Sequence, residues 1–153
     1  MCDSSSHHSG PESINVRRLQ PVITRTRLGV EMRRLIDTYL EQTRDAMGEE
    51  EFFYIGRHFE RKVKAVSASR IPWVRELAEE MRLLHQIYQA HSEGEVHLDD
   101  DAISNIGLAL FYFVNPYDII PDHVPGKGYL DDAYVFNLCI RRLKKHAPQL
   151  VLD

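Results

Sequence analysis

The sequence lacks several features that would indicate a function directly. It contains only two cysteines, Cys2 and Cys139, and their placement fits neither a disulfide framework nor a metal-ligand pattern. The most apolar run, IGLALFYFV at 106–114, is about half as long as the roughly 20 residues of a membrane-spanning helix. The N-terminus shows no charged segment followed by an apolar core, so no secretory signal is expected. These absences favour a cytoplasmic protein without a transmembrane segment.

A strong charge of either sign is also absent. The formal net charge is −4 over 153 residues, which disfavours nucleic acid as a partner. There is no serine or cysteine nucleophile constellation and no paired-histidine metal helix, and the GKG at 126–128 is too short to cradle a phosphate. The chain therefore carries none of the common catalytic signatures.

The residues that are present predict one all-α domain. With 43% hydrophobic and 27% charged residues, the chain has the composition of a single globular unit. We expect a disordered tail at 1–16 and a single helical domain at 17–153, because residues 1–16 are polar and of low complexity. No segment alternates apolar and polar residues as a strand does.

Helical periodicity recurs in five places. Apolar residues repeat at helical spacing in segments bounded by glycine, proline and acidic residues, which predicts five helices. Their expected ranges are 28–47, 49–68, 72 to near 91–95, 97–115, and 133 to about 146. The three aspartates at 99–101 lie where a helix dipole favours negative charge, and the widened apolar face of 106–114 predicts a central, buried helix.

The stretch NPYDIIPDHVPGKGYLDD at 115–132 connects the last two predicted helices. Its prolines disfavour a long helix, its glycines permit unusual backbone angles, and its apolar residues can anchor it to the core. We therefore expect an ordered loop rich in proline, glycine and aspartate. Asp131 or Asp132 is expected to cap the final helix.

This region resembles a known family signature. The sequence FYFVNPYDIIPDHVPGKGYLDDAYV at 111–135 is similar to the pattern P-x-D-x-I-P-D-x-x-P-x-x-G-x-x-D-D of the YkvA-like family of small bacterial helical domains. The resemblance covers residues 103–143. The matching positions are Pro116, Asp118, Ile120, Pro121, Asp122, Pro125, Gly128, Asp131 and Asp132. It implies a domain of unknown function, some of whose members are called membrane associated, and no reaction or cofactor transfers with it.

The aspartates allow two interpretations. In the first, they cap helices and bind the loop through hydrogen bonds to backbone amides. In the second, Asp118, Asp122 and Asp132, with His123 beside them, form an oxygen-rich site for Mg²⁺, Mn²⁺ or Ca²⁺. Carboxylates that lie within a few ångströms of one another need a cation, a proton or a basic side chain to offset their repulsion.

A cluster of arginines near the first helix is a further feature. It consists of Arg17, Arg18, Arg25, Arg27, Arg33 and Arg34. Such a cluster is typical of a solvated face, although an acidic protein, RNA or an anionic lipid could also bind it.

From these patterns we expect an interaction or regulatory module that binds another protein, located in the cytoplasm or peripherally at a membrane. The alternatives are a metal-dependent enzyme, for example a hydrolase, that uses the loop aspartates, and a peripheral membrane-associated protein.

Overall fold

The computed structural model describes residues 17–115 and 128–152. Within these ranges the chain forms α1 (Val30–Arg44), α2 (Glu49–Ser67), α3 (Pro72–Ser92), α4 (Asp100–Val114), α5 (Leu130–His146) and the short 3₁₀ helix η3 (Pro148–Leu150). The described residues contain no β-strand, only an isolated parallel bridge between Leu19 and Val151. The all-α prediction is confirmed.

The helix starts follow local chemistry. The carboxylate of Glu51 accepts the backbone N–H of Gly48 at 2.8 Å before α2, and proline occupies the first turn of α3. Asp99 caps α4, because its carboxylate accepts the N–H of Ala102 at 2.8 Å. The starts of α2 and α3 agree with the expected ranges, and α4 begins at Asp100, three positions after the expected start at 97.

Boundaries of α1 and α5 also differ from the expected ones. α1 ends at Arg44, and the next residues form a turn in which the N–H of Ala46 bonds the carbonyl of Thr43. α5 begins at Leu130, three positions before the expected start at 133, because Tyr129 takes the left-handed conformation (φ 75°) and precedes the first helical residue. Apolar periodicity alone does not reveal that change in backbone direction.

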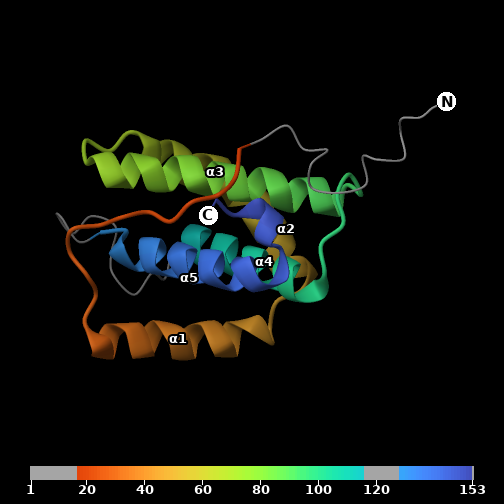
Figure 1. Ribbon diagram of the computed structural model, residues 1–153, viewed down its shortest axis with the longest axis horizontal. Helices are drawn as coiled ribbons and strands as arrows, with labels where there is room; N and C mark the ends of the chain where they lie inside the picture. Colours follow the sequence, from red (N-terminus) through yellow and green to blue (C-terminus); the bar gives the residue numbers. More distant parts are fainter. Residues whose placement is uncertain (1–16, 116–127, 153) are drawn as a thin grey trace.

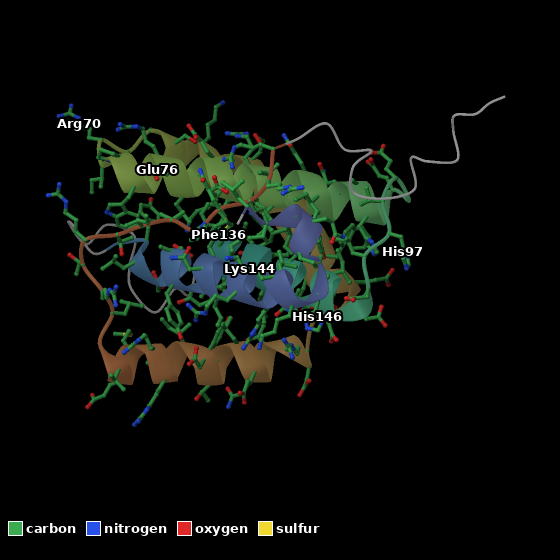
Figure 2. All side chains as sticks on the ribbon, in the orientation of Figure 1. Arg70, Glu76, His97, Phe136, Lys144 and His146 are labelled. Atoms are coloured by element: carbon green, nitrogen blue, oxygen red, sulfur yellow. The ribbon has the colours of Figure 1, made fainter. Side chains whose placement is uncertain are left out.

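α4 is the centre of the molecule, and it contacts all four other α-helices (Figure 1). Most of its residues are buried, as the wide apolar face of 106–114 predicts. Gly107 permits a close approach of α4 to α3, since a Cβ at this position would lie 3.2 Å from Cε1 of Tyr88. Phe136 of α5 is fully buried near the middle of the molecule (Figure 2). Among the described helices, none combines the length and the apolarity that a membrane-spanning segment needs.

α1 lies at the edge, along α4 and α5 (Figure 1). Only Ile36 and Leu40 of this helix are buried. Its attachment to the core is therefore narrower than that of α4 or α5, and much of its surface remains exposed.

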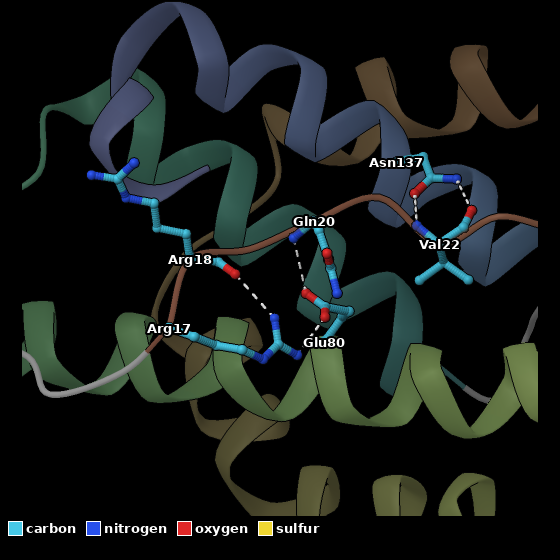
Figure 3. A network of polar contacts seen from close by, with 6 residues as sticks. All are labelled: Arg17, Arg18, Gln20, Val22, Glu80 and Asn137. Atoms are coloured by element: carbon cyan, nitrogen blue, oxygen red, sulfur yellow. Dashed lines mark hydrogen bonds and ion pairs between the residues drawn. The ribbon is translucent and has the colours of Figure 1, made fainter. Parts of the chain in front are cut away.

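Residues 17–28 form an extended segment that we call the N-terminal strap. The N–H of Leu19 donates to the carbonyl of Leu150 at 2.8 Å, and the N–H of Leu152 donates to the carbonyl of Leu19 at 2.7 Å. The side-chain amide of Asn137 forms two hydrogen bonds of 2.8 Å with the backbone of Val22 (Figure 3). The strap therefore joins the C-terminal segment to α5.

Glu80 of α3 holds the beginning of the strap (Figure 3). Its carboxylate is buried, forms an ion pair with Arg17, and accepts the N–H of Gln20 at 3.1 Å. A buried carboxylate requires such partners, because removing it from water is unfavourable. Arg17 is thus paired across the fold, whereas the sequence alone suggests a solvated arginine.

Candidate functional site

The signature is only partly inside the described residues. Gly128, Asp131 and Asp132 are described. The remaining signature and candidate ligand positions, which lie outside the described residues, are Pro116, Asp118, Ile120, Pro121, Asp122, His123 and Pro125. Asp132 is therefore the one proposed metal ligand whose surroundings the structure describes. Within 17–115 and 128–152, no three His, Cys, Asp or Glu side chains gather as a metal site would require.

Asp131 and Asp132 lie in the first turn of α5, and both side chains are fully buried (0% exposed). The N-cap of this helix is Tyr129, so the expectation that Asp131 or Asp132 would cap it is wrong. Both carboxylates are nevertheless near the positive end of the helix dipole, which favours negative charge in the first turn. Their position suits charge stabilisation inside the protein.

A hydrogen bond joins α4 to the start of α5. The hydroxyl of Tyr112, which is itself buried, donates to Oδ2 of Asp131 at 2.7 Å. A buried tyrosine needs a partner for its hydroxyl, and a carboxylate is a strong acceptor. This contact fixes the last turn of α4 against the first turn of α5.

α1 joins the same arrangement through Tyr39. The side-chain amide of Asn115, at the end of α4, donates to the hydroxyl of Tyr39 at 2.6 Å. The rings of Tyr39 and Tyr112 meet edge to face, with centroids 5.7 Å apart. We call this group the polar cluster, and its members are Tyr39, Tyr112, Asn115 and Asp131.

α2 contributes a cation next to this cluster. The ammonium group of Lys62 lies 5.4 Å from the ring centroid of Phe113 and 5.6 Å from that of Tyr129. Such cation–π contacts are attractive when the rings are partly desolvated. Helices α1, α2, α4 and α5 therefore all supply side chains around the described part of the signature.

Sequence reasoning did not identify Tyr39, Tyr112 or Lys62. Tyr112 carries one detectable signal, because a hydroxyl within an otherwise apolar run must find a partner once buried. Tyr39 and Lys62 carry none, since their partners are far away along the chain; Asn115 and Tyr39, for example, are 76 positions apart.

Comparisons with known proteins concern this same region. Residues 102–138 match the family model described as "Protein of unknown function (DUF1232)". A protein from Bacillus subtilis (strain 168), described as "Uncharacterized membrane protein YkvA", is 46% identical over 41 residues. That match covers 27% of this chain and 39% of the relative. No solved structure shows significant similarity to the chain. Residues 102–138 are therefore similar to the DUF1232 family and to the YkvA relative, and the similarity is limited to this part of the chain.

Proposed function

We propose that the protein is a protein-interaction module in which the YkvA-like segment braces the helices and performs no catalysis. The observation that supports this proposal is the complete burial of Asp131 and Asp132 in the first turn of α5. A catalytic carboxylate has to reach a substrate or a water molecule, whereas a bracing carboxylate accepts hydrogen bonds from inside the fold. The bond from Tyr112 to Asp131 fits the second role.

An interaction module also needs an exposed surface that a partner can cover. Phe52 and Phe53, at the start of α2, are 37% and 56% exposed. They lie beside a cavity of about 320 Å³ that Ile55 and Tyr88 also line. The ring centroids of Phe52 and Tyr88 are 5.7 Å apart, so α2 and α3 form one continuous aromatic surface. We define this aromatic surface by Phe52, Phe53 and Tyr88.

Exposed apolar surfaces of this kind mark protein-binding sites. The cavity also includes Arg57 at its edge. The partner that fits is therefore an amphipathic helix that inserts apolar side chains and presents an acidic one to Arg57.

Phe53→Ser is expected to abolish binding to such a partner without changing the fold. The wild-type protein and two variants, Phe53→Ser and Ile23→Ser, are immobilised and exposed to a cell lysate. Quantitative mass spectrometry then compares the proteins that each of the three retains. Ile23 is the matched control, because it is 84% exposed on the strap, outside the aromatic surface. We expect proteins that the wild type and Ile23→Ser retain and Phe53→Ser loses. Identical retention by all three would contradict the proposal.

His85 lines the same cavity and should make stability depend on pH. Its ring stacks on Phe59 at 4.0 Å, and burial lowers its pKa below the ordinary value of 6.5; Glu60 opposes this shift and Arg82 adds to it. The unfolded chain then binds a proton at a higher pH than the folded chain. The His85 contribution is therefore most favourable above 6.5 and is lost as the pH falls below that value.

Urea unfolding at about pH 7.5 and about pH 5.5 measures this effect. The free energy of unfolding of the wild type should fall more between the two conditions than that of His85→Gln. Equal decreases would mean that His85 does not contribute to the pH dependence.

A second candidate function is peripheral association with a membrane. It is supported by the description of the Bacillus subtilis relative as a membrane protein and by the exposed side chains of Ile23 and Val30 on either side of Arg25 and Arg27. Apolar and basic residues together suit an anionic interface. Co-sedimentation with anionic but not neutral vesicles tests it.

The third candidate is a metal-dependent enzyme that uses Asp118, Asp122, Asp132 and His123. Apart from Asp132, these residues lie outside the described residues. A metal-dependent rise in the unfolding temperature would favour this candidate over the interaction module.

A further inference from the structure

A groove of about 510 Å³ lies between the strap, α1 and α5. Four of the side chains that line it are cationic, and they come from all three elements. Arg27 belongs to the strap, Arg33 to α1, and Arg141 and Lys144 to α5. Lys144 lies on the part of α5 that faces the viewer in Figure 2. We call this the basic groove and define it by Arg27, Arg33, Arg141 and Lys144.

We propose that the basic groove binds an organic phosphate. This site is separate from the aromatic surface and extends beyond the interaction module proposed above. No acidic residue lines the groove within the described ranges, and none of its four cations forms an ion pair with another described residue. Four cations around one cavity repel each other, and an anionic ligand relieves that repulsion.

Tyr134 lies in the wall of the groove and reports its electrostatics. Its hydroxyl donates to Oδ1 of Asp37 at 2.7 Å. Burial and Asp37 raise the pKa of Tyr134, while Arg141 and Arg33 lower it. Arg33 of α1 and Arg141 of α5 therefore both lie close enough to the Tyr134 hydroxyl to lower its pKa. Asp37 offsets part of their charge, and the remaining cations leave a positive excess.

The groove is built before any ligand arrives. The two hydrogen bonds between Asn137 and Val22 fasten the strap to α5 at the groove wall. The hydroxyl of Thr24 donates to the carbonyl of Thr26 at 2.7 Å and shapes the next turn of the strap. Because these contacts fix the wall in advance, binding does not have to order it.

The lining indicates the chemical class of the ligand. Guanidinium groups offer paired N–H donors that match the oxygens of a phosphate. The volume of about 510 Å³ falls in the range of small-molecule sites, and it exceeds what one phosphate group needs. Ile23, Leu28 and Tyr134 supply apolar surface for the organic part of the ligand. A soluble phosphate ester and a phospholipid headgroup both have this chemistry.

Titration of the full chain with three probes tests the proposal. The probes are adenosine monophosphate, inorganic phosphate, and phosphatidylcholine vesicles with and without phosphatidic acid. Arg33→Gln and Arg141→Gln remove groove cations, and Arg34→Gln and Lys145→Gln are matched controls on the same helices outside the groove. All four positions are exposed, so unchanged unfolding temperatures are expected.

We expect each groove variant to weaken binding about tenfold and each control by less than about twofold. Binding of adenosine monophosphate would identify a soluble ester, and binding only to vesicles with phosphatidic acid would identify a lipid headgroup; both support the groove. Absence of binding to every probe, or equal weakening by the controls, would overturn it. Phe53→Ser should bind the probes like the wild type, which separates this site from the aromatic surface.

Discussion

Asp131→Ala should lower the free energy of unfolding by about 3 kcal/mol. The substitution removes the acceptor of the Tyr112 hydroxyl bond, which is 2.7 Å long and buried, and it leaves a space inside the core. It also removes a negative charge from the first turn of α5, where the helix dipole favours one. Urea unfolding followed by far-UV circular dichroism measures the loss.

The role of the hydrogen bond can be separated from the role of the charge. Tyr112→Phe keeps the ring and removes only the hydroxyl, so it should lower stability by about 1 kcal/mol. In a double-mutant cycle, Tyr112→Phe should have a smaller effect when Asp131 is already alanine. Asp100→Ala, at an exposed position in the first turn of α4, is the control and should change stability by less than about 0.5 kcal/mol. Strict additivity of Tyr112→Phe and Asp131→Ala would contradict a direct coupling.

Glu80→Ala should lower the free energy of unfolding by about 2 kcal/mol. Glu80 is buried on α3, and its carboxylate is the partner of both Arg17 and the N–H of Gln20. Breaking a fully buried ion pair has a larger effect, but the Arg17 side chain is about half exposed, and water screens part of its charge. Chemical denaturation of the wild type and the variant measures the change in the free energy of unfolding.

Two variants make the Glu80 result specific. Glu79→Ala, at the preceding exposed position of α3, should be neutral within about 0.5 kcal/mol. Glu80→Gln keeps an oxygen acceptor for Gln20 and should lose less stability than Glu80→Ala. If Glu79→Ala and Glu80→Ala were equally destabilising, the strap would not depend on the buried carboxylate.

The helices were predictable because their signals are local. Pro72, Asp99 and the glutamates at the start of α2 are helix-start residues, and apolar periodicity supplies the rest. The strap was not predictable, because its attachments join residues far apart in the chain. Val22 and Asn137, for example, are 115 positions apart, and neither shows a local sign of the pairing.

The candidate site was predictable only in part, because its motif is a local signal whereas its packing depends on distant segments. The motif that ends in Asp131 and Asp132 is visible in the sequence, but their complete burial results from the packing of α4 and α5. The expected helix cap failed because Tyr129 adopts a left-handed backbone and starts the helix earlier. The arginine cluster in the sequence contributes only Arg27 and Arg33 to the basic groove. The other two cations, Arg141 and Lys144, come from the opposite end of the chain, so the sequence alone does not reveal the groove.

We propose that the signature aspartates brace the fold. Thermal unfolding of the wild type and Asp132→Asn, each with EDTA, Mg²⁺, Mn²⁺ or Ca²⁺, tests it most directly. We expect that no ion changes the wild-type midpoint and that Asp132→Asn unfolds at a lower temperature in every condition. An ion at about 100 times its dissociation constant would add about 2.7 kcal/mol and raise the midpoint by several degrees. A rise of that size for one ion, present in the wild type and absent in Asp132→Asn, would show that the aspartates form a metal site and do not serve as braces.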